Sequence, residues 1–136
     1  MKIDISALLQ DSVGPLLWTP VDVSGAGITL TVTADGCIAY KLPGFVLAFF
    51  DFQYPNPVTG TLPALIGGLP FRSKPTTNAI GGSVVAASNA TTIPNNWAVL
   101  PDSFTMQFVI NGTAQNNSVM ANVLARGAVI YPIPEA

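Results

Sequence analysis

The sequence predicts an all-β fold: an antiparallel β-sandwich of jelly-roll type with a short N-terminal arm. Three observations support this prediction. Short segments of alternating or continuous apolar residues recur at strand length along the chain. Two dipeptides that favour hairpin turns, Asp35-Gly36 and Asn111-Gly112, lie beside such segments. Beyond the first residues no helical pattern is evident, and roughly eight strands with intervening turns are typical of two packed sheets.

Residues 1–17 are expected to form an attachment arm, and residues 18–136 the β-sandwich domain. Ser6 can cap a short helical turn, and Gly14-Pro15 interrupts the chain before the domain. A helix this short is marginal alone, so it needs a partner surface. The alternative is a strand or turn packed on its own domain. The residues expected to contact a partner are the apolar ones: Ile3, Ile5, Leu8, Leu9 and Val13.

Three strands are expected in the first half of the domain, around its first turn signal. Residues 28–33 alternate between apolar side chains and threonine, which indicates a half-buried strand. Asp35-Gly36 is expected to turn the chain into a second strand at residues 37–41. The continuous apolar run of residues 45–50 predicts a strand buried on both faces. Prolines between residues 55 and 70 then indicate loops rather than a central strand.

Further strands are expected at residues 83–87, 103–110, 118–124 and 127–131, and Asn111-Gly112 closes the second of these with a hairpin turn. In residues 103–110 large apolar side chains alternate with mostly polar ones, which is the clearest strand pattern in the chain. The predicted core residues are Ile28, Leu30, Val32, Phe49, Phe104, Met106, Phe108 and Ile110.

The composition indicates a subunit whose surface is buried against other subunits. Only 9% of residues are charged, whereas a soluble domain typically has roughly 25%. The mean hydropathy is +0.49. A membrane protein is the alternative, but no run of about 18 apolar residues could form a spanning helix, and the strands are too short for a transmembrane barrel. Five dispersed basic residues also argue against a nucleic-acid partner.

No secretory signal is expected at the N-terminus, because Asp4 and Asp11 interrupt any apolar stretch there. The chain is therefore expected to mature in a reducing cytosol, or to leave the cell by another route such as lysis. The single cysteine, Cys37, fits this expectation because no internal disulfide is possible. Its position on a predicted strand favours a small buried apolar side chain over a nucleophile.

The residue types argue against an enzyme. The sequence has no histidine, which removes the usual nucleophile–base pairs and the commonest transition-metal ligand. One cysteine cannot build a structural zinc site, so neither a metal nor a cofactor is expected. A glycosidase needs only two carboxylates, and Asp51 and Asp102 are the plausible pair. Both are better explained as solvated turn carboxylates, which lack a partner that would raise a pKa.

Four short motifs lie in order along most of residues 18–131. They are Trp18-Thr19-Pro20, Gly36-Cys37-Ile38-Ala39-Tyr40-Lys41, Gly68-Leu69-Pro70-Phe71 and a closing strand that ends at Tyr131. Taken in this order, they resemble a recurrent module of phage virions, the small trimeric β-sandwich proteins found as head decoration (cement) proteins and at tail-fibre tips.

The resemblance implies a homotrimer that decorates the outer surface of a capsid and binds neighbouring major capsid proteins. A tail-fibre tip that recognises a host-surface glycan is the alternative. Tip domains end a long shaft, whereas only seventeen residues precede Trp18, which favours decoration. A glycan-binding lectin is a third hypothesis, and it would need exposed aromatic side chains among Tyr54, Phe71 and Trp97.

Overall fold

The computed structural model describes residues 12–58, 60–76, 81–88 and 95–134, and this part of the chain is built of strands. Two short 3-10 helices, η1 (Ala34–Gly36) and η2 (Asn117–Met120), interrupt them. The strands are β1 (Val13–Leu17), β2 (Val21–Asp22), β3 (Thr31–Val32), β4 (Ile38–Leu42), β5 (Phe45–Gln53), β6 (Leu65–Gly67), β7 (Gly81–Ser88), β8 (Asn95–Val99), β9 (Met106–Ile110), β10 (Thr113–Ala114) and β11 (Leu124–Pro132).

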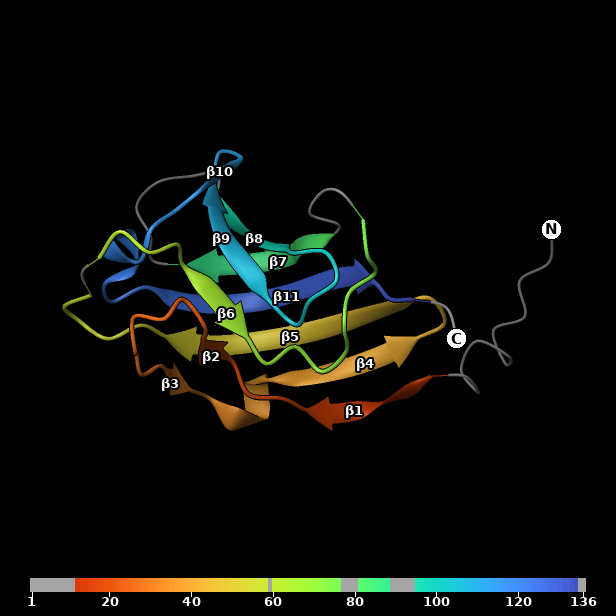
Figure 1. The fold of residues 1–136 in the computed structure, drawn as a ribbon. Helices are drawn as coiled ribbons and strands as arrows, with labels where there is room; N and C mark the ends of the chain where they lie inside the picture. The colour runs from red at the N-terminus through yellow and green to blue at the C-terminus, as the bar shows by residue number, and fades with distance from the viewer. Residues whose placement is uncertain (1–11, 59, 77–80, 89–94, 135–136) are drawn as a thin grey trace.

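The strands pair in one path, β1-β4-β5-β11-β7-β8-β9-β6-β2, with β3 on β5 and β10 on β9. The path folds over at β7, which pairs with β11 over most of its length but with β8 only at Gly81 and Gly82. The second part, β8-β9-β6-β2, therefore lies over the first as a second layer (Figure 1). The prediction of an all-β fold with two antiparallel layers is confirmed, whereas the jelly-roll connectivity stays a prediction.

The two ends of this path are joined by three residues, because Trp18–Pro20 connect β1 in one layer to β2 in the other. The backbone N–H of Trp18 donates to the carbonyl of Cys37 at 3.1 Å, beside the start of β4. The buried indole donates to the carbonyl of Phe49 at 2.8 Å. These two hydrogen bonds attach the Trp18 segment to the start of β4 and to the middle of β5.

The Asp35-Gly36 turn was predicted as a two-residue hairpin, and that prediction is wrong. The dipeptide lies in η1, which carries the chain past the middle of β5 between β3 and β4. The approach is close: a Cβ atom on Gly36 would lie 2.7 Å from the Cβ of Asp51. The Asp51 carbonyl accepts a hydrogen bond from Thr33 N at 3.0 Å. The backbone of β5 thus bonds to this irregular segment where neither β3 nor β4 pairs with it.

Strand β5 is buried on one face only, contrary to the prediction for residues 45–50. Its even-numbered side chains are buried and its odd-numbered ones are at least partly exposed. The buried face meets aromatic residues of the second layer, with ring centroids 5.1–6.3 Å apart within the cluster. Edge-on and tilted rings at such distances are a favourable packing arrangement. The cluster consists of Phe50, Phe52, Tyr54, Trp97 and Phe108.

The predicted core is confirmed in part. Met106 and Phe108 are fully buried, and four other predicted residues pack partly buried against the core: Ile28, Leu30, Val32 and Ile110. Two predictions are wrong, because Phe49 is 38% exposed and Phe104 is 41% exposed. Phe49 takes an odd-numbered, outward position on β5. Phe104 lies in the turn before β9, where the Arg72 guanidinium covers its ring at 5.4 Å.

Other differences concern where strands begin and end. Within residues 28–33 only Thr31–Val32 is a strand, and residues 118–124 form a 3-10 helix and a turn rather than a strand.

The turn at Asn111-Gly112 is confirmed: both residues have positive φ, 51° and 78°, and β10 folds back onto β9. Positive φ at both central residues is the requirement of the tight hairpin turn that this dipeptide favours.

Candidate functional site

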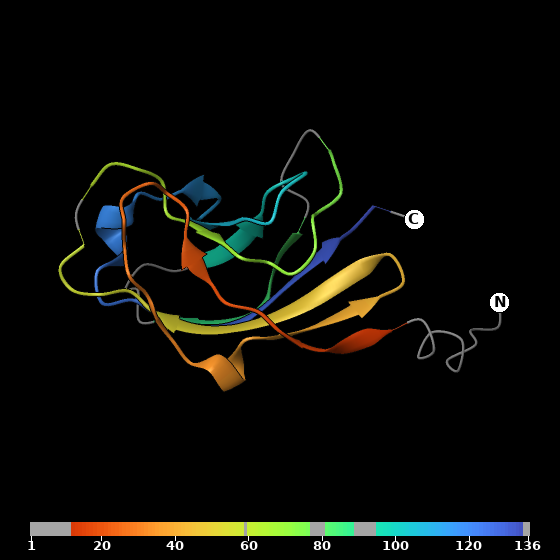
Figure 2. The same ribbon diagram turned by 60° about the horizontal axis from the view of Figure 1, so that its bottom comes forward.

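The outer face of the first layer is apolar and carries three exposed large apolar side chains. Leu17 on β1 is 76% exposed, Phe49 on β5 38% and Ile130 on β11 39%. Half-buried residues connect these three side chains across the sheet. Leu17 lies opposite Ile38 on β4, and Leu47 on β5 lies opposite both Tyr40 on β4 and Ile130 on β11. Figure 2 shows the second layer on the other side of this sheet, and η1 projecting below it. We call this surface the outer face.

A hollow of about 300 Å³ indents the outer face beside η1. It is lined by Ile38, Tyr40 and Phe49 of the sheet and by Asp35 and Gly36 of η1. The hollow is a consequence of the irregular path of η1, because the 3-10 turn stands up from the sheet at the point where regular pairing with β5 is interrupted. An apolar hollow of this kind accepts an apolar side chain from another molecule.

Two of the charges on the outer face compensate each other. Asp51 and Arg126 are cross-strand partners on β5 and β11, and the guanidinium Nε lies 3.3 Å from the carboxylate. Beyond them the Gln53 amide donates to the side chain of Asn122 at 2.9 Å. Neutral or internally paired polar groups at the border of an apolar surface are typical of a protein interface, whose core is depleted of charge.

The two carboxylates considered for catalysis, Asp51 and Asp102, are not brought together. Asp51 lies opposite Arg126 on β11. Asp102 sits in a turn bonded to Lys74, whose N–H in turn donates to the carbonyl of Pro132. Arg126 and Pro132 are six residues apart on β11, about 20 Å at strand spacing. A glycosidase pair needs roughly 5–9.5 Å, so these residues do not form one.

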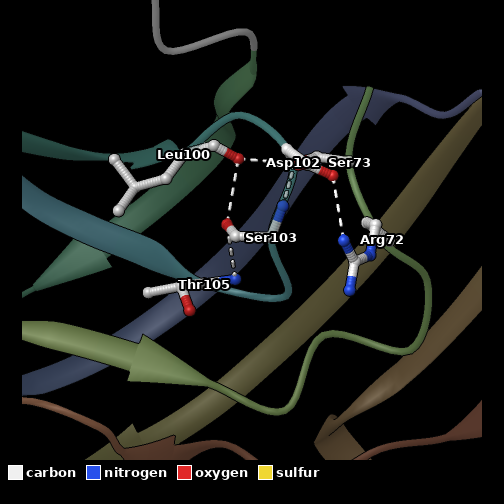
Figure 3. Close-up of polar contacts among 6 residues, drawn as sticks. All are labelled: Arg72, Ser73, Leu100, Asp102, Ser103 and Thr105. Carbon is white, nitrogen blue, oxygen red and sulfur yellow. Dashed lines mark hydrogen bonds and ion pairs between the residues drawn. The ribbon is translucent and has the colours of Figure 1, made fainter. Parts of the chain in front are cut away.

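Asp102 belongs instead to a polar network that joins two loops (Figure 3). The buried hydroxyl of Ser73 donates to the carbonyl of Leu100 and accepts from the N–H of Ser103 at 3.1 Å. The exposed Arg72 binds the Asp102 carboxylate at 3.0 Å. In each of these contacts, a polar group of one loop is paired with a polar group of the other loop. The network therefore holds the two loops together and offers no group positioned for chemistry.

A second hollow, of about 310 Å³, lies between β2 and the segment before β3. Asp22 is its only charged lining residue, and its carboxylate accepts three hydrogen bonds from its own loop. The donors are the N–H and hydroxyl of Ser24, at 3.1 and 2.6 Å, and the N–H of Ile28, at 3.1 Å. The carboxylate stabilises this glycine-containing loop, which leaves little capacity to bind a ligand.

Cys37 is fully buried, as predicted for a small apolar side chain. Burial raises the pKa of its thiol, which keeps it protonated and unreactive at neutral pH. Among the described residues, no group of three or more Cys, Asp or Glu side chains is placed to hold a metal ion. In the same part of the chain, no helix is long and apolar enough to span a membrane.

The aromatic residues considered for glycan binding do not form an exposed platform. Tyr54 and Trp97 are buried in the aromatic cluster, so they are unavailable to a ligand. Phe71 is half-buried, with the Lys41 ammonium 5.7 Å from its ring centroid. A lectin site needs a ring face open to solvent, and the structure provides none at Tyr54 or Trp97.

The short motifs at opposite ends of the domain meet in space. Gly68 has φ +93°, and a Cβ there would lie only 2.2 Å from the carbonyl oxygen of Thr19. The buried Tyr131 hydroxyl donates to the carbonyl of Phe71 at 2.9 Å. The mid-chain Gly-Leu-Pro-Phe segment thus packs against both the crossing at Trp18 and the last strand. Its residues have structural roles in closing the domain.

Of the residues expected in the attachment arm, only Val13 lies in the described part of the chain; Ile3, Ile5, Leu8 and Leu9 lie outside it. Val13 begins β1, which pairs with β4, and its side chain is exposed. Gly14-Pro15 forms a bulge within this strand rather than a break. For residues 13–17 the structure thus shows the alternative, a strand packed on its own domain.

The outer face is not evident from residues 45–50 alone, because their continuous apolar run predicts a strand buried on both sides. A signal was present: the odd-numbered positions continue into Asp51 and Gln53, while the even-numbered positions continue into Phe52 and Tyr54. Alternation over the whole strand therefore distinguishes an outer face from an inner one. Leu17 and Ile130, in contrast, gave no such signal.

Comparison with protein-family models, with curated proteins and with solved structures finds no match to this chain.

Proposed function

We propose that the chain is a structural protein of a phage virion: a capsid decoration (cement) protein that acts as a homotrimer and binds neighbouring major capsid proteins on the outer surface of the head. The observation that supports this most is the outer face, an apolar sheet surface with an internal ion pair in a chain of unusually low charge. An exposed apolar surface of this extent usually marks a protein interface.

Other functions find less support among the described residues. Their four aspartates and four basic residues leave no basic patch for nucleic acid. The carboxylate pair is separated, and the loop network is internally satisfied. A tail-fibre tip that binds glycan is the weaker alternative, because the aromatic side chains it would use are buried at Tyr54 and Trp97.

Attachment to the capsid is assigned to the N-terminal segment. Ile3, Ile5, Leu8 and Leu9 would contribute roughly 6–12 kcal/mol if buried, by the usual value of 1.5–3 for each side chain. Ordering the segment would offset much of this gain, at about 1–2 kcal/mol per residue. One arm therefore binds weakly, and three arms on one trimer bind well through their high effective concentration.

The test is sedimentation with phage particles that lack the protein. The full chain should pellet with the particles, and should do so at moderate salt because the contact is mainly apolar. Deletion of residues 1–11 should weaken binding at least tenfold while leaving thermal unfolding unchanged. The deletion stops before β1, since removing residues 13–17 would also remove a strand of the sheet. Equal binding by the truncated chain would reject the arm, and no binding by the full chain would reject the decoration role.

A further inference from the structure

We infer that the outer face is the surface through which copies of this chain associate, with Leu17 of one copy seated in the hollow beside η1 of the next. This deepens the proposed function and rests on its claim that the chain assembles with itself. Four observations support a second copy as the occupant: the size of the face, its charge, the placement of Leu17 beside the hollow, and the character of the sheet edge.

The face is large enough for a specific protein interface. The five strands of the first layer, β1, β4, β5, β11 and β7, present an area on the order of 600 Å², given about 3.3 Å per residue and 4.8 Å between strands. In a ring of three, each copy divides this face between its two neighbours, so that the three copies together would bury on the order of 1,800 Å² over three contacts, within the range of stable assemblies.

The charge pattern suits a copy of the same chain better than a charged partner. Asp51 and Arg126 form an ion pair within one face, so neither needs a counter-charge from the other side. The rest of the central surface is apolar: Ile38, Tyr40, Leu47, Phe49 and Ile130. Asp35 is exposed on η1 at the hollow, where solvent can screen its charge, whereas the central surface itself can meet an identical surface without like-charge contact.

Leu17 and the hollow are complementary in shape and chemistry. Leu17 is the most exposed large apolar side chain described, and its cross-strand partner Ile38 lines the hollow. Within one molecule Leu17 stands beside the hollow rather than in it. A contact in which Leu17 enters the hollow of a neighbour gives each copy one projecting and one receiving site, the arrangement that closes into a ring such as a trimer.

The edge of the first layer is a poor alternative for self-association. Pro15 lacks a backbone N–H, and the bulge between Val13 and Leu16 distorts the pairing of β1. Prolines and bulges on an edge strand are the usual means of preventing a second molecule from adding a strand. Contact through the face rather than the edge leaves this protection in place.

The experiment measures protection of a thiol placed on the outer face. Because Cys37 is buried, the unaltered chain gives little background labelling by a maleimide. Ile130→Cys introduces a thiol on the face, and Val119→Cys introduces a matched control on η2, where the native side chain is 44% exposed compared with 39% for Ile130. Light scattering on each sample reports the assembly state.

At concentrations where the protein is assembled, the thiol of I130C should react at least tenfold more slowly than that of V119C. Dilution to monomer should make the two rates equal. Equal rates in an assembled sample would overturn the assignment of this face while leaving the homotrimer standing. A monomer at all concentrations would overturn self-association itself and the homotrimer with it.

A charge-introducing pair of variants provides an independent measurement. Phe49→Asp places a carboxylate on the outer face, and Phe104→Asp places one at a site of similar exposure outside it. F49D should weaken self-association at least tenfold, since each contact would then contain buried like charges, whereas F104D should leave it unchanged. Equal effects of the two variants would contradict the proposal, and the thiol measurement decides the matter if F49D does not fold.

Discussion

The indole nitrogen of Trp18 donates a hydrogen bond of 2.8 Å to the carbonyl oxygen of Phe49. Trp18 occupies the three-residue crossing between the two layers, and Phe49 lies in the stretch of β5 where neither β3 nor β4 pairs with it. A side chain thus replaces a strand as the partner of a backbone carbonyl. The same bond fixes the position of the Phe49 backbone, from which the aromatic ring projects onto the outer face.

The contribution of this hydrogen bond to stability can be measured by replacing Trp18. Trp18→Phe keeps an aromatic ring at the crossing but removes the donor, which leaves the Phe49 carbonyl without that hydrogen bond. We expect the free energy of unfolding to fall by about 1–3 kcal/mol, the usual cost of an unsatisfied buried polar group. Urea denaturation followed by circular dichroism would report the change, and a loss under about 0.5 kcal/mol would mean that the bond contributes little.

Two phenylalanines that the sequence placed together in the core should behave differently. Phe108 is fully buried in the aromatic cluster, so Phe108→Ala should cost about 3–5 kcal/mol. Phe104 is 41% exposed and lies beneath Arg72, so Phe104→Ala should cost about 1 kcal/mol, mainly the worth of its cation–π contact. The comparison uses denaturation midpoints of both variants. Similar losses would show that the position of β9 in the structure is wrong.

Two glycines with nearly the same backbone angle separate crowding from conformational strain. Gly25 has φ +91° and open space around it, so Gly25→Ala should cost about 1–2 kcal/mol from the left-handed conformation alone. Gly68 has φ +93°, and an added Cβ would meet the Thr19 carbonyl. Gly68→Ala should therefore cost a further 1–3 kcal/mol or so, typical of overpacking. Thermal unfolding would distinguish them, and equal losses would argue against the close approach.

Two buried tyrosines predict a loss of stability in alkali. Burial raises the pKa of the Tyr54 and Tyr131 hydroxyls above their ordinary value of about 10. Below about pH 10 both are neutral whether the chain is folded or unfolded. Above it the unfolded chain releases protons that the folded chain retains, so the free energy of unfolding falls as pH rises.

The measurement compares urea denaturation near neutral pH and above about pH 10, with tyrosinate absorbance recorded in the folded protein. Tyr54→Phe should reduce the alkaline loss. At neutral pH it should cost little, because the Tyr54 hydroxyl has no hydrogen-bond partner among the described residues. Tyr131→Phe should cost about 0.5–1.5 kcal/mol there, since it removes the bond to Phe71. Ionisation of Tyr54 in the folded protein near pH 10 would contradict this expectation.

The parts of the fold that the sequence predicted are those fixed by local chemistry. Asn111-Gly112 forms its hairpin because both residues adopt positive φ readily, and Met106 and Phe108 point inward because β9 alternates regularly. Asp35-Gly36 has the same local preference but forms η1, since the close passage beside Asp51 determines the path there. Such a tertiary contact leaves no signal in the dipeptide itself.

The outer face depends on information that no single segment contains. Whether Phe49 points into the core or out of it is decided by which side of the sheet the second layer covers. Leu17 belongs to the face only because β1 pairs with β4, and the sequence before Trp18 gave equal support to an arm. Strands β6 and β8 were missed for a related reason, because short segments next to proline or asparagine carry little strand signal by themselves.

The most direct measurement is the mass of the full chain in solution, determined by light scattering across micromolar concentrations. Self-association through the outer face predicts three times the 14.1 kDa mass of one chain at the upper end, falling toward the monomer on dilution. The same series on Phe49→Asp should remain at the lower mass, and that on Phe104→Asp should follow the unaltered chain. A mass of 14.1 kDa for the unaltered chain at every concentration would contradict a structural protein that works as an assembly.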